Sequence, residues 1–110
     1  MNFNSIDVLK SALGQFFSEN FYTDAVTLLR KALKEDKYYN ENWYGVIQLI
    51  VKKELQIGEP LNLMDNDANL PLEENSDEEA YKWLTLMIIN SVGQSGSPII
   101  DYADLFKPTA

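Results

Sequence analysis

The sequence predicts an all-α protein: a compact bundle of four main helices that forms a single helical domain over residues 1–110. Three observations predict this fold class. Apolar side chains recur three and four residues apart in four separate stretches. Polar residues able to cap a helix stand at the start of these stretches. The apolar content of 45% is that of an ordinary globular protein, and 110 residues suffice for one modest hydrophobic core.

The first two predicted helices occupy the first third of the chain. Asn4 or Ser5 can cap the first helix, which fades near residues 18–20. Its apolar stripe consists of Ile6, Leu9, Leu13, Phe16 and Phe17. Thr23 is the expected cap of the second helix, with Asp24 in its first turn. Near the end of the second helix stand three basic residues, whose charge suits the helix dipole: Arg30, Lys31 and Lys34.

The third predicted helix begins at Asn40 and carries Trp43 on its apolar face. Gly58 and Pro60 prevent its continuation. The segment that follows, residues 55–75, is predicted to be a long acidic loop of irregular or locally extended structure, because prolines, asparagines and aspartates argue against helix. Loops of this length often carry function. Four leucines are expected to pin it to the core: Leu61, Leu63, Leu70 and Leu72.

The fourth helix, predicted over about residues 77–92, has the clearest sequence signal. Ser76 followed three residues later by Glu79 forms a capping box. The helix is apolar on most sides, which predicts a central position among the others. Trp83 belongs to this apolar surface, and Gly93 ends the helix. After a flexible turn, residues 99–106 are expected to form a short C-terminal helix or strap.

The charge of the chain is distributed unevenly. The net charge is −8, and nearly all of the excess negative charge lies after residue 53, where Lys82 and Lys107 are the only basic residues. A field of this sign repels nucleic acids and membrane surfaces and attracts cationic proteins. We therefore expect a cationic protein partner, and neither direct nucleic-acid binding nor membrane binding.

Several kinds of chemistry lack their usual residues. The sequence contains neither cysteine nor histidine, which removes thiolate nucleophiles, the commonest general base and the commonest zinc ligands. Asp65, Asn66 and Asp67 resemble the start of a calcium loop, but Leu70 stands where that loop needs glycine and Ser76 where it needs glutamate. We expect a polar turn there, no cofactor and no catalysis. The N-terminus lacks the pattern of a secretory signal, so a cytoplasmic location is expected.

The predicted partner-binding residues lie on the acidic segment and the start of the fourth helix. They are Asp65, Asp67, Glu73, Glu74, Asp77, Glu78, Glu79 and Tyr81. Acidic residues in the first turn of a helix stabilise it, so Asp77, Glu78 and Glu79 also have a local explanation. Tyr81 fits an interface residue and a residue at the core edge equally well.

Two resemblances to known families add to this interpretation. The first half is similar to a degenerate tetratricopeptide hairpin over about residues 10–46, and no second copy follows. The matching residues are Leu13, Gly14, Phe17, Tyr22, Ala25, Ala32, Leu33, Asp36 and Trp43. The whole chain resembles small acidic bacterial immunity proteins paired with contact-dependent inhibition toxins and colicin-like nucleases. The stretch that most suggests them is NLPLEENSDEEAYKWL at residues 69–84.

The second resemblance implies a mode of action but transfers no individual functional residue. An immunity protein would neutralise a cationic toxin domain, often a nuclease, by occluding its basic surface. The alternative is a tetratricopeptide-like adaptor that binds a peptide between the second and third helices. A third hypothesis, an acidic mimic that occupies nucleic-acid-binding proteins, differs from the first only in its target. Association with a toxin should slow as salt rises, whereas binding in an apolar groove should depend little on salt.

Overall fold

The chain is helical throughout most of the part that the structure describes, which is residues 4–70, 72, 75–93 and 96–100 of a computed structural model. Five α-helices and two π-helical turns, η1 and η2, follow one another there, and no strand occurs among these residues. The all-α class is therefore confirmed. The elements are α1 (Ser5–Ala12), η1 (Leu13–Phe17), α2 (Tyr22–Glu35), α3 (Lys37–Val51), α4 (Glu59–Asn62), η2 (Leu63–Asp67) and α5 (Asp77–Ser91).

The start of α1 agrees with the sequence prediction. The Asn4 side chain accepts a hydrogen bond from the Ile6 N–H at 2.9 Å, which satisfies one of the helix's unpaired donors. The helix continues into η1, where the Ser18 N–H donates to the Leu13 carbonyl five residues back. Buried residues Leu9 and Leu13 belong to the stripe that the periodicity predicted.

The starts of α2 and α3 differ from the predictions. The residue preceding α2 is Phe21, which makes no side-chain capping bond, so Thr23 is not the cap. Asp36, not Asn40, caps α3 by accepting a hydrogen bond from the Tyr39 N–H at 3.1 Å. Asn40 instead donates from Nδ2 to the Leu33 carbonyl at 3.1 Å. Since Asp36 alone separates α2 from α3, one residue ends the first helix and begins the second.

Residues 55–75 contain helix where an irregular loop was expected. Gly58 takes the left-handed conformation with φ of 86°, and Pro60 lies in the first turn of α4, where a missing N–H costs nothing. Gly58 and Pro60, which were predicted to prevent continuation of the third helix, thus also begin a new helical turn. The expected leucine anchors do pack on the core: Leu63 and Leu72 are buried, and Leu61 and Leu70 are half-buried.

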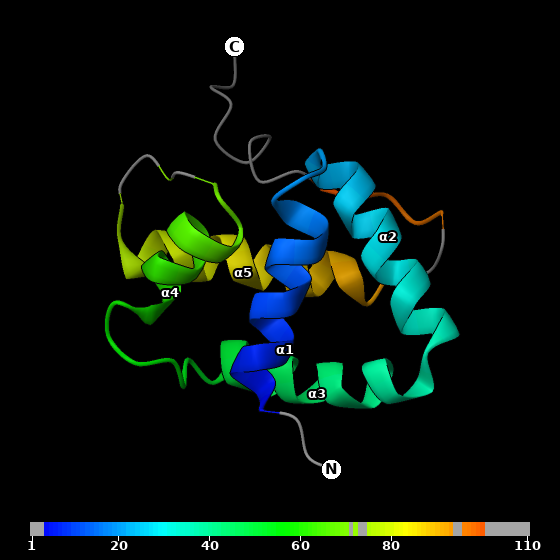
Figure 1. Cartoon of the computed structure of the whole chain (residues 1–110), viewed down its shortest axis with the longest axis horizontal. Coiled ribbons are helices and arrows are strands. Elements are labelled where there is room, and N and C mark those ends of the chain that lie inside the picture. The colour runs from blue at the N-terminus through cyan, green and yellow to red at the C-terminus, as the bar shows by residue number, and fades with distance from the viewer. Residues whose placement is uncertain (1–3, 71, 73–74, 94–95, 101–110) are drawn as a thin grey trace.

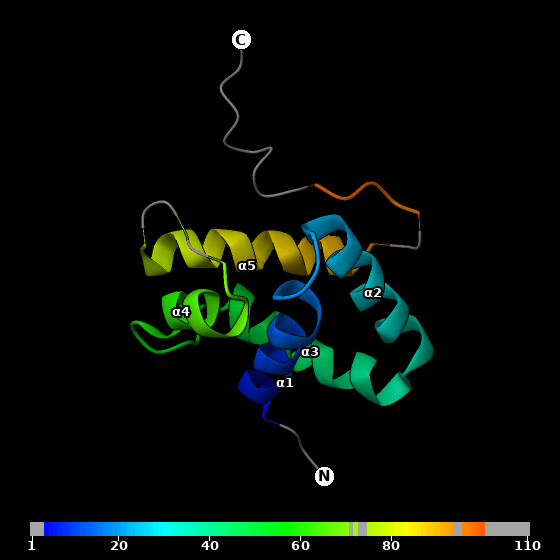
Figure 2. The same ribbon diagram turned by 45° about the horizontal axis from the view of Figure 1, so that its top comes forward.

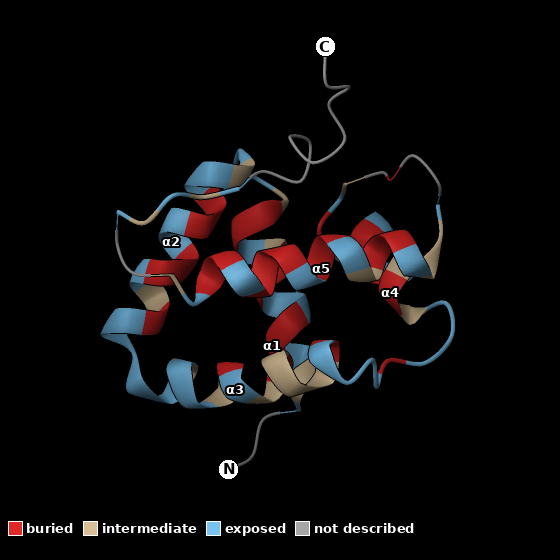
Figure 3. Cartoon of the chain, turned by 180° about the vertical axis from the view of Figure 1, so that it is seen from behind, coloured by how far each residue is buried: buried red, intermediate tan, exposed pale blue. Residues whose placement is uncertain are grey.

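The prediction for α5 is confirmed at its start and in its central position. The Ser76 Oγ accepts a hydrogen bond from the Glu79 N–H at 3.1 Å, as in a capping box. Trp83 packs edge-on against Phe17 and Tyr22, with ring centroids 5.2 and 5.7 Å away. Buried residues follow one another along most of the helix (Figure 3), which contacts α2, α3 and α4.

The helices are not all aligned side by side, as they would be in a bundle. Figures 1 and 2 show α3 and α5 running in opposite directions, with α1 crossing them, α2 at one end and α4 at the other. At the crossing of α1 and α3, a Cβ on Gly45 would collide with the Ser5 side chain, so glycine permits the close approach. The predicted four-helix bundle is not confirmed. Of the C-terminal segment, residues 96–100 pass over α2 and α5, and residues 101–106 lie outside the described residues.

The cap at the junction of α2 and α3 can be tested by mutation. We predict that Asp36→Ala lowers the free energy of unfolding by about 1 kcal/mol, because the Tyr39 N–H loses its acceptor. Urea unfolding followed by circular dichroism measures the change. Glu41→Ala, an exposed residue one turn further along α3, is the control and should change stability by less than about 0.5 kcal/mol. Equal effects of the two substitutions would show that Asp36 does not act as the cap.

Candidate functional site

The structure describes six of the eight predicted contact residues, and these six differ in their exposure and in their contacts. Asp65 and Glu78 are exposed, and Asp67 is half-buried. Asp77, Glu79 and Tyr81 make contacts within the protein, as described below. Glu73 and Glu74 lie outside the described residues. The structure places α4, η2 and the start of α5 at the same end of the molecule (Figure 1), so Asp65, Asp67 and Glu78 do share one region.

Asp77 connects the starts of two helices. One carboxylate oxygen, Oδ2, accepts a hydrogen bond from the Gly58 N–H at 2.6 Å, and Oδ1 accepts one from the Leu61 N–H at 3.2 Å. These are main-chain donors before and within the first turn of α4, which a negative charge stabilises. Asp77 therefore fixes the position of α4 against α5, and this contact occupies both of its oxygens.

Glu79 and Tyr81 also belong to the interior side of α5. The Glu79 residue is only 6% exposed. The Tyr81 hydroxyl accepts a hydrogen bond from the Leu55 N–H at 3.2 Å, and the Lys53 ammonium lies 5.6 Å from the centre of the Tyr81 ring. Burial raises the pKa of Tyr81; the hydrogen bond with Leu55 opposes this shift, and the charges of Asp77 and Glu59 add to it. Tyr81 thus lies at the edge of the core, one of the two roles left open by the sequence.

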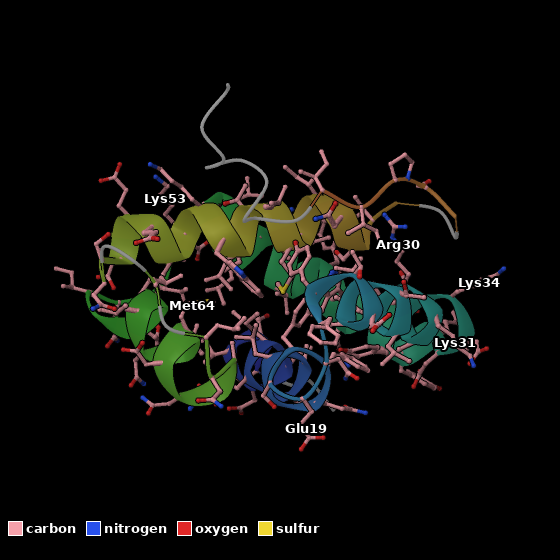
Figure 4. The ribbon with its side chains drawn as sticks, turned by 90° about the horizontal axis from the view of Figure 1, so that it is seen from above. Glu19, Arg30, Lys31, Lys34, Lys53 and Met64 are labelled. Carbon is pink, nitrogen blue, oxygen red and sulfur yellow. The ribbon has the colours of Figure 1, made fainter. Side chains whose placement is uncertain are left out.

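A groove of about 820 Å³ lies at the opposite end of the molecule, between α2, α3 and the end of α5. The eight contact residues predicted from the sequence include none of the residues that line this groove in the described part of the chain. Figure 3 shows these three elements from the side of α5, and Figure 4 shows Lys31 and Lys34 extending outward from α2. The residues lining the groove are Thr27, Arg30, Lys31, Leu33, Lys34, Glu35, Asn40, Trp43, Tyr44, Ile47, Ser91, Val92, Gly93 and Gly96.

Trp43 holds α3 against the end of α5 at this groove. Its ring is 2% exposed, and its Nε1 donates to the Ser91 Oγ at 3.0 Å. The Ser91 hydroxyl in turn donates to the Ile88 carbonyl at 2.7 Å, so each polar atom of this buried pair has a partner. Tyr39 packs on Trp43 with ring centroids 6.0 Å apart, and burial, with a smaller effect of the Asp36 charge, raises the pKa of Tyr39 to about 12.

Apolar side chains remain exposed beside these buried contacts. Tyr44 on α3 is 65% exposed and Val92 at the end of α5 is 62% exposed. Ile47 lies half-buried between the core and the groove. Trp43 on the inside and Tyr44 nearer solvent give the groove the mixture of apolar and polar surface found in binding sites.

We define the strap as residues 96–100. Arg30 lies at the end of the groove, where it contacts α5 and the strap. The side chain is 8% exposed and points toward the strap in Figure 4. Its Nε donates to the Asn90 carbonyl at 2.8 Å, Nη1 to the Ser97 carbonyl at 2.8 Å, and Nη2 reaches the Pro98 carbonyl at 3.5 Å. A positive charge at the C-terminal end of a helix is favourable, and here it comes from a different helix.

Gly93 and Asn90 complete this contact. A Cβ on Gly93 would lie 2.5 Å from Nη2 of Arg30, so the space beside the end of α5 exists only because the residue is glycine. The Asn90 side chain donates to the Tyr22 hydroxyl and to the Ile100 carbonyl, both at 2.8 Å, and accepts from the Ile100 N–H at 3.1 Å. The strap is thereby attached to α2 and α5 at two points.

The role of Arg30 was not predicted, although the sequence contains a signal for it. Arg30 is the only arginine of the chain, and it is spaced from Val26 and Leu33 so that it falls on the apolar face of α2. A lone arginine on an apolar face predicts a buried acceptor set, because its guanidinium cannot lose its charge. The favourable interaction of a positive charge with the end of its own helix already explained Arg30 in the sequence, so a buried contact was not expected.

Two kinds of feature, a cluster of metal-ligating side chains and a membrane-spanning helix, are absent from the described residues. No cluster of three or more acidic, histidine or cysteine residues suited to a metal ion occurs among the described residues. The Asn66 side chain, in the stretch that resembles a calcium loop, donates to the Asn62 side chain. Within the same residues, no helix has the length and apolar character needed to cross a bilayer.

Comparisons with known proteins identify no relative. No protein-family model, curated protein or solved structure matches the chain.

Asp77 and Asp65 can be compared directly, because both belong to the predicted acidic site and only Asp77 has an internal role. We predict that Asp77→Asn lowers the free energy of unfolding by about 1–2 kcal/mol, since an amide cannot accept at both oxygen positions. Asp65→Asn, at an exposed position, should change it by less than about 0.5 kcal/mol. Urea unfolding of both variants provides the test. If both substitutions are neutral, Asp77 does not hold α4.

Proposed function

We propose that this chain is a non-catalytic protein-binding domain and that the groove between α2, α3 and the end of α5 is its contact surface. The observation that carries the proposal is the groove itself, a concave surface of about 820 Å³ that combines exposed apolar and basic side chains. Its volume lies within the range of about 300–1,000 Å³ typical of ligand sites. It is large enough to take several side chains of a bound segment.

The position of the groove supports the helical-adaptor hypothesis. That hypothesis places a bound peptide between the second and third helices, and α2 and α3 supply most of the groove's lining. The end of α5 adds a third wall that a two-helix hairpin would lack. Tyr44 and Val92 both line the groove and are the exposed apolar residues that such a peptide would cover.

The second candidate is the immunity function, in which the acidic end of the molecule occludes a cationic toxin domain in the cytoplasm. Two observations favour it. Asp65 and Glu78 are both exposed at the same end of the molecule, and the second half of the chain carries a strong negative charge. The internal contacts of Asp77, Glu79 and Tyr81 reduce the surface available for such a contact. This candidate therefore ranks after the groove.

Three variants separate the two surfaces. Tyr44→Ser with Val92→Ser removes exposed apolar side chains from the groove, and Asp65→Lys with Glu78→Lys reverses charge at the acidic end. Val51→Ser with Ile89→Ser is the matched control, since these residues are similarly exposed on the same two helices and do not line the groove. Tagged wild type and variants are used to capture partners from native cells, and bound proteins are quantified by mass spectrometry.

We predict that a protein retained by the wild type and the control is lost from the groove variant by about tenfold or more, the effect of removing two contact side chains. The interaction is then verified with the purified partner by calorimetry. Loss from the acidic-end variant alone would contradict the proposal and support the immunity candidate. Retention by all the variants would exclude both surfaces.

A further inference from the structure

The charge of the groove is opposite to that of the whole protein. Its lining contains three basic side chains, Arg30, Lys31 and Lys34, against one acidic side chain, Glu35. The chain as a whole carries −8. Basic residues are scarce in this sequence, and a third of its nine lysines and arginines line this one groove. The groove is therefore a place where an anionic group would find a favourable field.

The three basic residues have different roles. Arg30 is buried and its guanidinium donates to main-chain carbonyls at the end of α5 and in the strap, so it is a fixed part of the wall. Lys31 and Lys34 are exposed and extend from α2 beside it (Figure 4). Their ammonium groups are able to move toward a ligand, whereas the guanidinium of Arg30 is already bonded to carbonyls at the end of α5 and in the strap.

The range of electrostatic forces limits the size of the anionic partner. Screening reduces interactions beyond about 8 Å at physiological salt, so a short segment lying in the groove responds mainly to the local basic residues. A nucleic acid extends far beyond the groove and would meet the negative charge on the rest of the protein. Exposed Tyr44 and Val92 also favour a ligand with apolar side chains, which a polynucleotide backbone does not offer.

From this combination we infer that the groove binds an acidic amphipathic segment of a partner protein. A carboxylate of the segment lies beside Lys31 and Lys34, and an apolar side chain packs between Tyr44 and Val92. The inference rests on the proposed function and adds the chemistry of the partner. Salt dependence then no longer distinguishes the two surfaces, because binding at the groove and binding at the acidic end would both weaken as salt rises. The charge of the partner is what distinguishes them.

The two tryptophans provide a test with an internal reference. Trp43 lines the groove, and its indole N–H bonds Ser91 there. Trp83 lies on the same helix as Ser91, about 12 Å earlier along its axis, and packs in the core against Phe17 and Tyr22. In nitrogen-15 spectra of the full chain, the two indole N–H resonances report separately on the groove and on the core.

Three synthetic peptides of equal length are titrated into the labelled protein. Each contains leucine and tyrosine at the same positions, with glutamate, glutamine or lysine at the remaining ones. We expect the glutamate peptide to shift the Trp43 indole resonance with saturation, to leave that of Trp83 in place, and to bind more tightly than the other two. Affinity for the glutamate peptide should fall as salt is added.

Charge reversal on α2 tests the contribution of the lysines. Lys31→Glu with Lys34→Glu is expected to weaken binding of the glutamate peptide about tenfold, since two favourable pairs become repulsive. Lys31→Gln with Lys34→Gln should weaken binding of the glutamate peptide about threefold, and this pair is used instead if charge reversal disturbs the fold. Lys10→Glu with Lys52→Glu, at exposed positions outside the groove, makes the same change in net charge and should alter affinity by less than about twofold.

The possible failures have different meanings. If the glutamine or lysine peptide binds the groove as tightly as the glutamate peptide, the inference about acidity is wrong and the groove remains a binding surface. An unchanged affinity after charge reversal at Lys31 and Lys34 likewise overturns the inference alone. If no peptide moves the Trp43 resonance, or if each moves both indoles equally, the groove is not the contact surface and the proposed function fails with it.

Discussion

The contact of Arg30 with the end of α5 is the interaction on which the rest of this structure depends. It joins α2 to the last turn of α5 and to the strap through three main-chain carbonyls. Burying a guanidinium costs several kcal/mol unless its donors are satisfied, so these acceptors are a condition of the fold. Gly93 supplies the space, and Asn90 uses its side chain to attach Tyr22 and Ile100 to the same point. The position of the groove, which includes Arg30, Ser91 and Gly93, follows from this junction.

The other end of α5 is held by the same kind of interaction with the opposite charge. Asp77 accepts hydrogen bonds from main-chain N–H groups at the start of α4, where the helix dipole favours an anion. Each end of the central helix is thus tied to a neighbouring element by one charged side chain bonded to main-chain groups. This arrangement has a functional consequence. Residues that look like an acidic contact surface in the sequence are partly engaged in folding, and the exposed basic residues of α2 remain available beside a groove.

Local sequence signals predicted the parts of the fold that depend on local interactions. The cap at Ser76, the central position of α5 and the burial of Leu63 and Leu72 follow from spacing and capping chemistry. The start of α3 was predicted four residues from its capping residue, because Asp36 and Asn40 are equally good caps in sequence and only the tight junction with α2 selects Asp36. Pro60 was interpreted as a break, although proline also suits a helix start, as it does in α4.

The candidate site was harder to predict because it depends on contacts between distant residues. Asp77 and Gly58 are 19 residues apart, and Arg30 and Asn90 are 60 apart. No periodicity encodes such pairs, so the acidic segment appeared as a free surface, and the adaptor hypothesis placed a peptide between the second and third helices without the wall that α5 adds. A single arginine on an apolar helix face was the one available signal, and it pointed to a buried acceptor set whose position the sequence left open.

The role of Arg30 can be measured most directly by the equilibrium unfolding of Arg30→Met, with Lys31→Met as its neighbour on the exposed side of α2. Methionine keeps much of the apolar stem and removes the donors. The structure predicts that Arg30→Met lowers the free energy of unfolding by about 2–3 kcal/mol relative to Lys31→Met, because the carbonyls of Asn90 and Ser97 lose a charged hydrogen-bond donor. A difference below about 0.5 kcal/mol would contradict the account, because α5 and the strap would then be held without Arg30.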